Sequence, residues 1–322
     1  METTTTTKLR TVFMGTSAFA EEILISLIDA KYNLMAVYTQ PDKKVGREQQ
    51  LQKSAVKITA ERNNIPVLEP HKFDEVVIQK LKNLQPELIV VAAYGKILPK
   101  TVLDIPQFGA INVHTSLLPK YRGSSPIHHA ILNGEKETGV TIMRMDAGMD
   151  TGDILTQKIV PIEKDETTPE LSQKLSRISS QLLLETLPRW ISGEIKSTPQ
   201  DETQATLCRL LEKADGQISW TDTAANIYNR YRAFHPWPGV YTFWEHSGTS
   251  KRIKLTKINH RENKVDPSHP IGAVYKIDEK IGVQTAAGVI ILEELQLEGK
   301  ANISILNFIN GYPSFIGSIL KS

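Results

Sequence analysis

The sequence predicts an α/β part built on a parallel sheet, followed by a small β-barrel. In the first half, short apolar runs alternate with runs of helical period, as in parallel sheets joined by helical crossovers. Later in the chain, strand-like runs follow one another with turn residues between them. We expect one domain at 1–196, a linker at 197–207 and a second domain at 208–322.

The elements of the first part follow in order along the chain. Four-residue spacing of Phe19, Ile23 and Leu27 marks the first helix. Thr168, Pro169 and Gly193 have the residue types that begin and end a long helix. The predicted strands are 11–15, 34–39, 65–70, 87–95, 109–116 and 138–146, and the predicted helices are 17–30, 54–63, 73–84 and 168–192. Ligands of such sheets bind beyond the carboxyl ends of the strands.

The second part begins with a helix at 221–234 and continues as strands. The strand-like runs are 239–248, 251–260, 272–280 and 281–295, the last divided by a hairpin turn at Ala287-Gly288. The run from Ser250 to Lys264 holds six Lys and Arg against one Glu, and is either the solvated face of a strand or a surface that contacts phosphates.

Composition limits the class of protein. Cys208 is the single cysteine of 322 residues, which excludes a disulfide framework and metal sites built on cysteine. No apolar run has membrane-spanning length, and the N-terminus lacks the apolar segment of a secretory signal. We therefore expect a cytoplasmic protein that makes no membrane contact and holds no metal.

One turn resembles a dinucleotide-binding site but lacks its glycines. The stretch "MGTSAFA", from Met14 to Ala20, has one glycine where the dinucleotide fingerprint needs three. The missing glycines are those that let the backbone approach a pyrophosphate. We therefore interpret it as a plain strand-to-helix turn and expect no dinucleotide.

Two groups suggest a catalytic site. Asn112 and His114 lie two apart, so both face one side of a strand near its carboxyl end. The stretch "MDAGMDTGD" carries Asp146, Asp150 and Asp153 at spacings that do not match a calcium loop. We expect this loop to present Asp150 to His114, because a carboxylate beside an imidazole favours its charged form and fixes its orientation.

These three groups fit acyl transfer. An amide and an imidazolium can stabilise an oxyanion, and a carboxylate can orient the histidine or accept a proton from an attacking amine. Thr115 and Ser116 raise the alternative of a hydrolase with a Ser–His–Asp triad, but the chain has no G-x-S-x-G elbow. Direct transfer to an amine needs no enzyme nucleophile.

Seven stretches together resemble the methionyl-tRNA formyltransferase family. They are "FMGTSAFA", "VYTQPDKKVGR", "VVAAYGKILP", "INVHTSLLPKYRG", "ETGVTIMRMDAGMDTGDIL", "QDETQATL" and "RAFHPWPGVYT". The resemblance implies a Rossmann-like formyltransferase domain with a C-terminal OB-like β-barrel. It also implies transfer of a formyl group from 10-formyltetrahydrofolate to the amino group of methionyl-initiator tRNA, giving formylmethionyl-tRNA for translation initiation.

The resemblance also implies site residues. The family's catalytic Asn, His and Asp match Asn112, His114 and Asp150. The folate site would comprise Ser116, Leu117, Leu118 and Pro119, with Ile97 and Leu98 completing the pterin pocket. The tRNA contacts would be Lys43, Arg47, Lys251, Arg252 and Lys254. In the loop at 45–57, usually more basic in the family, this chain has Glu48, Gln49 and Gln50.

Several alternatives share some of these features. A formyltransferase for an amino sugar nucleotide has the same three catalytic groups, and "TQPD…GR" argues against it. A 10-formyltetrahydrofolate hydrolase would use water as the acceptor. An RNA-binding module without activity would not need Asn112, His114 and Asp150 intact. "FHPWPG", from Phe234 to Gly239, is either a stacking platform for RNA or a packing corner, and we favour the corner. We expect a monomer.

Overall fold

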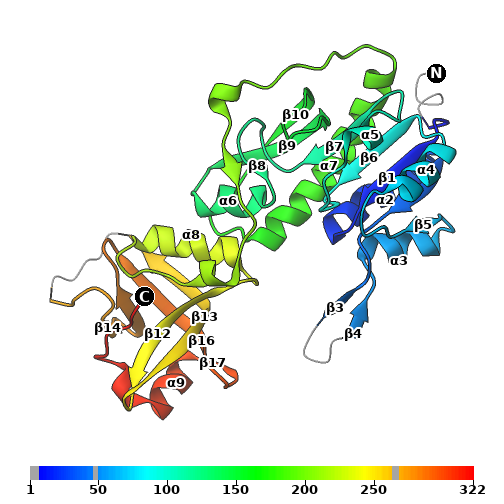
Figure 1. The fold of residues 1–322 in the computed structure, drawn as a ribbon. Helices are drawn as coiled ribbons and strands as arrows, with labels where there is room; N and C mark the ends of the chain where they lie inside the picture. The colour runs from blue at the N-terminus through cyan, green and yellow to red at the C-terminus, as the bar shows by residue number, and fades with distance from the viewer. Residues whose placement is uncertain (1–6, 46–49, 263–267) are drawn as a thin grey trace. The chain divides into compact units, whose positions relative to one another are not determined.

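A computed structural model describes residues 7–45, 50–262 and 268–322 (Figure 1). The chain forms two compact units. The first comprises residues 1–126, 137–161 and 170–209, and the second comprises 127–136, 162–169 and 210–322. Two short stretches before residue 170 therefore belong to the second unit, and the segment at 197–209 belongs to the first.

The first unit is built on a seven-stranded sheet in the order β10-β9-β7-β6-β1-β2-β5. Its strands are β1 (Thr11–Gly15), β2 (Leu34–Tyr38), β5 (Val67–Leu68), β6 (Leu88–Ala92), β7 (Ala110–His114), β9 (Glu137–Arg144) and β10 (Ile154–Pro161). The strand order reverses direction between β1 and β6, which is where such sheets bind ligands. Strands β5, β2, β1, β6 and β7 are parallel, which confirms the predicted α/β class.

The pairing of β9 and β10 differs from the sequence prediction. The alternation of strands and helices predicted parallel pairing and no strand at β10, but β9 runs antiparallel to β7, and β10 runs antiparallel to β9. Arg144 at the end of β9 pairs with Ile111 near the start of β7. The loop that joins β9 to β10 therefore begins at the amino end of β7, not at its carboxyl end.

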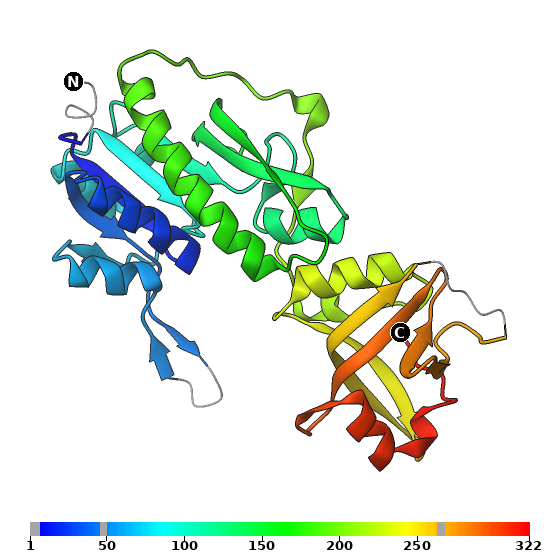
Figure 2. The same cartoon turned by 180° about the vertical axis from the view of Figure 1, so that it is seen from behind.

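Helices cover both faces of this sheet. The helices of the unit are α2 (Ala18–Asp29), α3 (Ala55–Arg62), α4 (Glu75–Asn83), α5 (Lys100–Leu103) and α7 (Thr168–Ile191). Figure 2 shows α2 and α7 over the same face. On the other face, Val12, Ile89 and Val91 pack with Leu81 of α4 and Val102 of α5 in one buried cluster. The strands carry few polar groups because both faces are covered.

Smaller elements complete the first unit. Strands β3 (Lys43–Val45) and β4 (Gln50–Gln52) pair as an antiparallel ribbon. Strand β8 (Arg122–Gly123) pairs in parallel with β11 (Leu207–Cys208), and a 3-10 helix spans Glu202–Gln204. The polar segment that the sequence predicted as a plain linker therefore pairs with a strand that follows β7.

Gly15 shows why the first turn has its glycine. A Cβ at Gly15 would lie 2.7 Å from a ring carbon of Phe13, 2.8 Å from Ala20 Cβ and 2.9 Å from Ala92 O. The glycine is thus required by close packing of β1, β6 and α2, in agreement with the plain strand-to-helix turn.

Gly15→Ala is accordingly expected to lower the free energy of unfolding by about 1–3 kcal/mol, the usual cost of overpacking. Thermal or urea denaturation measures this. Gly311→Ala is the matched control, because within the described chain its Cβ position has no atom within 4 Å beyond its neighbours in the chain and the backbone of its own helix. Equal effects of the two substitutions would show that β1 and α2 have room to separate.

The second unit is a curved antiparallel sheet with helices. The sheet has six strands in the order β12-β13-β16-β15-β14, with β17 paired to β16. It forms a half-barrel, which confirms the predicted β domain. The strands are β12 (Val240–His246), β13 (Thr249–Arg261), β14 (Val274–Ile277), β15 (Lys280–Gln284), β16 (Val289–Leu297) and β17 (Asn302–Ser304). The helices are α6 (Pro126–Leu132), α8 (Ala224–Phe234) and α9 (Ile305–Gly311), with 3-10 turns at Lys213–Gly216 and Pro313–Phe315.

Aromatic side chains form the core at one end of this sheet. The Trp244 ring contacts Phe308 at 5.8 Å and Phe315 at 5.2 Å between centroids, in edge-to-face geometry. Trp220 is buried and donates from Nε1 to Thr242 Oγ1 at 2.9 Å. The turn at Ala287-Gly288 joins β15 to β16 as predicted, with Gln284 paired to Val289.

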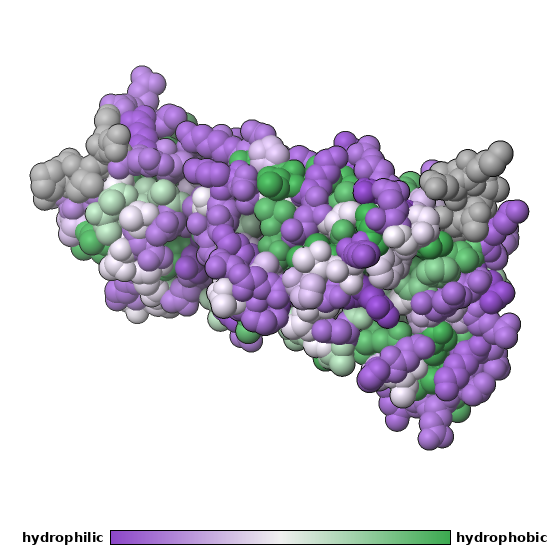
Figure 3. Space-filling view, turned by 90° about the horizontal axis from the view of Figure 1, so that it is seen from above, coloured by the Kyte–Doolittle hydropathy of each residue, from purple (hydrophilic) through white to green (hydrophobic). Residues whose placement is uncertain are grey.

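The surface carries scattered apolar side chains. In the view of Figure 3, hydrophobic residues lie in separate patches between hydrophilic ones. Isolated apolar groups of this kind are normal on protein surfaces. Within the described ranges, no helix is long and apolar enough to cross a membrane.

Candidate active site

Asn112 and His114 lie on β7 in the middle of the first sheet. Alternation along the strand places both side chains on one face, as the sequence predicted, and both are buried. Asn112 is paired in the sheet with Val91 of β6 and Met143 of β9. A strand with hydrogen-bonded neighbours on both sides holds these two groups rigidly.

Asp150 reaches these groups from the loop between β9 and β10. Its Oδ1 accepts from Asn112 Nδ2 at 3.4 Å, and its Oδ2 lies 3.7 Å from His114 Nδ1. Oδ2 also accepts from the backbone N–H of Gly123 at 2.8 Å. The structure thus brings together the three residues that the sequence singled out.

The hydrogen bonds of His114 determine its orientation. Nε2 lies 2.9 Å from the carbonyl oxygen of Tyr121, which can only accept, so Nε2 donates. Nδ1 is therefore the nitrogen that faces Asp150. The same carbonyl accepts from the Cys208 thiol at 3.3 Å. Burial raises the pKa of this thiol, so Cys208 is a neutral hydrogen-bond donor rather than a nucleophile.

The three acids of the loop differ in role. Asp146 accepts from the Gly148 N–H at 3.0 Å and from Thr151 Oγ1 at 2.7 Å, which closes the loop on itself. Asp153 accepts from Ser197 Oγ at 2.7 Å. Asp150 is the one whose carboxylate contacts Asn112 and His114, as expected from the sequence.

Buried side-chain hydrogen bonds fix the turn that follows His114. Ser116 Oγ donates to Lys120 O at 2.6 Å and is fully buried. Thr141 Oγ1 of β9 donates to Ser116 O at 2.6 Å and accepts from Leu118 N–H at 3.2 Å. Gln157 Nε2 donates to the same hydroxyl at 2.9 Å. Of the predicted folate residues at 116–119, Ser116 and Leu118 therefore point into the protein.

The loop after β6 carries the other two predicted folate residues. Leu98 is buried with Tyr94 in the core, whereas the side chain of Ile97 is 81% exposed. Burial, with a smaller contribution from Lys43, lowers the pKa of Lys96 in the same loop.

Two residues that the sequence analysis did not single out hold this loop. Thr16 Oγ1 donates to Tyr94 O at 3.1 Å, and Gln40 Nε2 donates to Tyr94 O at 2.9 Å and to Gly95 O at 3.1 Å. Thr16 and Gln40 follow β1 and β2, and polar residues directly after apolar strands are the signal that points to them.

The predicted tRNA residues are not all on one surface. Lys251 pairs with Trp244, so alternation places it on the face with the buried tryptophan. Arg252 and Lys254 pair with Phe243 and Tyr241 and share the other face. The Arg252 guanidinium lies 5.6 Å from the Tyr241 ring centroid and 3.3 Å from Glu298 Oε1. Lys43 is exposed at the start of β3, and Arg47 lies outside the described residues.

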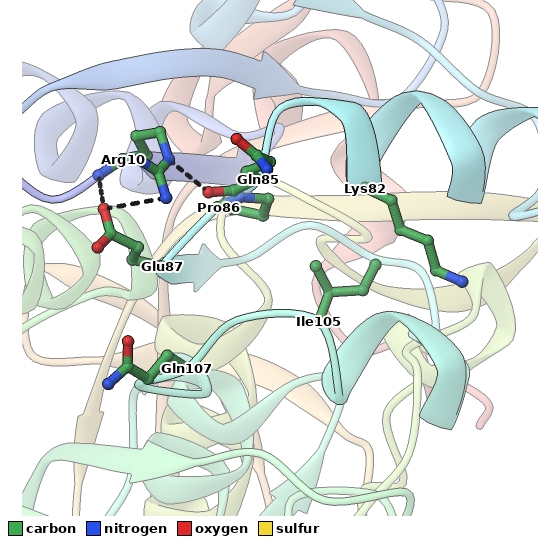
Figure 4. Close-up of a pocket in the computed structure, with 7 residues that line it drawn as sticks. All are labelled: Arg10, Lys82, Gln85, Pro86, Glu87, Ile105 and Gln107. Atoms are coloured by element: carbon green, nitrogen blue, oxygen red, sulfur yellow. Dashed lines mark hydrogen bonds and ion pairs between the residues drawn. The ribbon is translucent and has the colours of Figure 1, made fainter.

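A pocket of about 350 Å³ lies by the amino ends of the central strands β1 and β6 (Figure 4). Some of its polar groups bind one another: Arg10 Nε donates to Gln85 O at 2.7 Å, and the Arg10 backbone N–H donates to Glu87 at 2.9 Å. The pocket contains none of the predicted catalytic residues. Across the residues that the structure describes, no group of three or more His, Cys, Asp or Glu side chains could hold a metal ion.

Comparison with known proteins adds the family. The chain matches the model for formyl transferase over residues 9–187 and that for the formyl transferase C-terminal domain over residues 210–313. It is 45% identical to methionyl-tRNA formyltransferase of Caldicellulosiruptor saccharolyticus, covering 96% of this chain and 99% of that protein. It is 42% identical to that of Geotalea uraniireducens, covering 97% and 98%. The chain belongs to the methionyl-tRNA formyltransferase family.

A solved structure shares the fold of this family. An N-formyltransferase from Helicobacter canadensis, in complex with folinic acid and dTDP-3-aminofucose, superposes with a TM-score of 0.66. It is 19% identical and covers 88% of this chain and 98% of that one. The formyltransferase fold therefore serves acceptors of different chemistry, so the acceptor has to be argued from more than the fold.

Proposed function

We propose that this protein transfers the formyl group of 10-formyltetrahydrofolate to the amino group of methionyl-initiator tRNA. The observation that carries the proposal is the contact of the Asp150 carboxylate with both Asn112 and His114. Full-length similarity at 45% identity to a methionyl-tRNA formyltransferase supports the tRNA as acceptor. Likeness to the sugar enzyme at 19% identity supports the fold alone.

The side chains around the site fit the formyl donor. Met149, next to Asp150, is 58% exposed, and Ile97 of the loop after β6 is also exposed. Exposed apolar side chains such as these suit a ligand with a flat ring. When bound, the donor supplies a formyl carbon that an amine can attack. We propose that Leu117 and Pro119 complete this surface.

The three groups divide the work of the reaction. Asn112 Nδ2 gives one N–H to Asp150, and the second N–H can donate to the oxygen on which negative charge develops. The Asp150 carboxylate accepts the proton that the attacking amine loses. His114, oriented by the Tyr121 carbonyl, faces this carboxylate with Nδ1, which can accept a hydrogen bond from the carboxyl group once that group has taken up the proton.

Transfer is direct, without an acyl-enzyme. Ser116 Oγ is buried and already donates to Lys120 O. A buried hydroxyl that already donates to a backbone carbonyl argues against the alternative of a serine nucleophile. Cys208 is buried as a neutral thiol.

For the tRNA, we propose that Arg252 and Lys254 contact phosphates from one face of β13, and that Lys43 and Arg47 contact the acceptor end. The charge and the neighbouring rings of Tyr241 and Phe243 support a nucleic-acid surface on β12 and β13. Lys251, on the other face, is left out of this surface.

The double variant Arg252→Ala, Lys254→Ala is expected to weaken tRNA binding and to reduce the slope of log affinity against log salt by about 1–2, roughly one for each lost phosphate contact. Filter binding at several salt concentrations measures the slope. Lys251→Ala is the control from the opposite face of the strand. A larger effect of Lys251→Ala than of the double variant would contradict the assignment.

We further propose that the enzyme acts in the cytoplasm as a monomer. A single buried cysteine suits a reducing compartment. Asn112, His114 and Asp150 come from one chain, so the site does not need a second copy to be complete. Sedimentation of the pure protein tests the oligomeric state.

The function is tested by offering three acceptors in parallel. The protein is given 10-formyltetrahydrofolate with methionyl-initiator tRNA, with an amino sugar nucleotide, or with water alone. We expect rapid formation of formylmethionyl-tRNA and little product in the other two reactions. Faster formylation of the sugar amine, or formate release that the tRNA does not affect, would favour the respective alternative.

A further inference from the structure

We infer that Gln200 is a positioning residue for Asp150, held in place by the buried Arg122. The inference rests on the proposed function, because it concerns the carboxylate that accepts the proton in that reaction. In the sequence, Gln200 follows the long helix and precedes the half-barrel domain, in the segment that composition alone predicted to be a linker.

The carboxamide of Gln200 is fully engaged. Its Nε2 donates to the carbonyl oxygens of Asp150 at 2.8 Å and Gly152 at 2.7 Å. Its Oε1 accepts from Arg122 Nε at 3.0 Å and from Nη2 at 2.8 Å. Carbonyls only accept and a guanidinium only donates, so the amide has a single possible orientation. Both donor hydrogens and both lone pairs of the oxygen are used.

Arg122, on strand β8, binds the oxygen of this amide. The residue is 4% exposed, so its charge needs partners. Nη1 and Nη2 donate to the two carboxylate oxygens of Glu202 at 2.9 and 2.7 Å. The hydrogen bonds to Glu202 raise the pKa of Arg122, and those from Arg122 lower the pKa of Glu202. The guanidinium therefore holds Gln200 and Glu202 on one side of the loop.

Asp150 has a backbone conformation that needs such support. Its φ of 55° lies in the left-handed region, which residues other than glycine adopt only where their surroundings fix the backbone. A Cβ at Gly152 would collide with the Arg144 carbonyl, so the next turn of the loop is also tightly confined. Gln200 binds the carbonyls of Asp150 and Gly152, on either side of Thr151 in this confined stretch.

The segment that contains Gln200 also binds Tyr121, whose carbonyl orients His114. Tyr121 N–H donates to Thr206 Oγ1 at 2.8 Å, and Tyr121 O accepts from Cys208 Sγ as well as from His114. Residues 200–208 thus contact the backbone on either side of the Asp150–His114 pair. A shift of this segment would move the Asp150 carboxylate, which must lie within hydrogen-bond reach of the attacking amine. A misplacement of 1 Å can lower the rate of the reaction about 100-fold.

Gln200→Glu tests the inference. The carboxylate still accepts from Arg122 but offers no hydrogen to the Asp150 and Gly152 carbonyls. We expect kcat for formyl transfer to fall by about 10- to 100-fold, with little change in KM for tRNA or donor. Gln296→Glu is the matched control, because Gln296 Nε2 also donates to a backbone carbonyl, that of Lys300 at 2.8 Å, in the second unit. We expect it to leave kcat unchanged.

A double-mutant cycle separates positioning from a general loss of structure. In an Asp150→Asn background, Gln200→Glu should cause little further loss of kcat, because the group that it positions is already gone. Additive losses, or a wild-type kcat in Gln200→Glu, would overturn the inference. Absence of formylation by the wild-type protein would instead count against the proposed function, so the two failures are distinguishable. Arg122→Lys, which keeps the charge but loses the forked geometry, should reduce kcat in the same way.

Discussion

Asp150→Asn is expected to lower kcat for formyl transfer by at least ~100-fold, the usual scale for removing a proton acceptor. The amide cannot take the proton from the attacking amine, and it faces the Gly123 N–H and His114 differently from a carboxylate. The fold should survive, because asparagine tolerates the left-handed backbone of position 150 as well as aspartate does. Single-turnover formylation of methionyl-tRNA measures the loss.

The control for this substitution is Asp104→Asn. Asp104 pairs with Lys100 at 2.8 Å on an exposed helix surface, where such pairs contribute little. We expect normal kcat and an unchanged melting temperature. His114→Ala should resemble Asp150→Asn in its effect on kcat. Near wild-type turnover in both His114→Ala and Asp150→Asn would exclude these residues as the catalytic pair.

Thr141→Val is expected to destabilise the fold strongly, because it removes a buried hydroxyl that makes three hydrogen bonds. The hydroxyl donates to Ser116 O and accepts from Leu118 N–H and Gln157 Nε2, all around the turn that follows His114. Valine keeps the shape but leaves buried backbone groups without partners, each at about 1–3 kcal/mol. We expect the free energy of unfolding to fall by about 2–5 kcal/mol, which urea denaturation measures.

Thr138→Val on the same strand is the matched control. Its hydroxyl is buried but has no hydrogen-bond partner within the described part of the chain. Replacing it removes an unsatisfied polar group, so the variant should be as stable as the wild type or more stable. The same loss at both positions would show that the valine methyl groups, and not the hydrogen bonds, determine the effect.

The sequence was sufficient to predict the longer strands and helices of the first unit up to β9, but not β10 or the short elements β3, β4, β8, β11 and α5. Apolar residues recur with a different spacing in strands and in amphipathic helices, and this spacing predicted β1, β2, β6, β7 and the helices between them. Period carries no information on strand direction, so the antiparallel pairing of β9 and β10 was missed. That pairing explains why the loop of Asp150 folds back along β7 from its amino end.

The catalytic candidates were predictable because their spacing has a direct geometric meaning. Asn112 and His114 share a face by strand alternation alone. The three acids of the loop have no such pattern, and their different roles depend on Thr151, Ser197 and the carboxylate contacts. The alternation rule could have separated Lys251 from Arg252 and Lys254.

The segment at 197–208 was the least predictable part of the site. Its polar composition is typical of a linker, but its side chains bind backbone and arginine groups about 50 to 80 positions away in sequence. Hydrogen bonds of such long range leave no local periodicity. Gln200 and Arg122 could therefore be identified only from the three-dimensional structure.

The most direct test of the central claim is a single turnover with formyl-labelled 10-formyltetrahydrofolate, charged initiator tRNA and the protein in excess. Because Asp150 can accept the proton while Thr115, Ser116 and Cys208 are buried, the account predicts that the label moves to the amino group of methionine and is never found on the protein. Label trapped on Thr115 or Ser116, or released as formate while methionyl-tRNA stays unmodified, would contradict it.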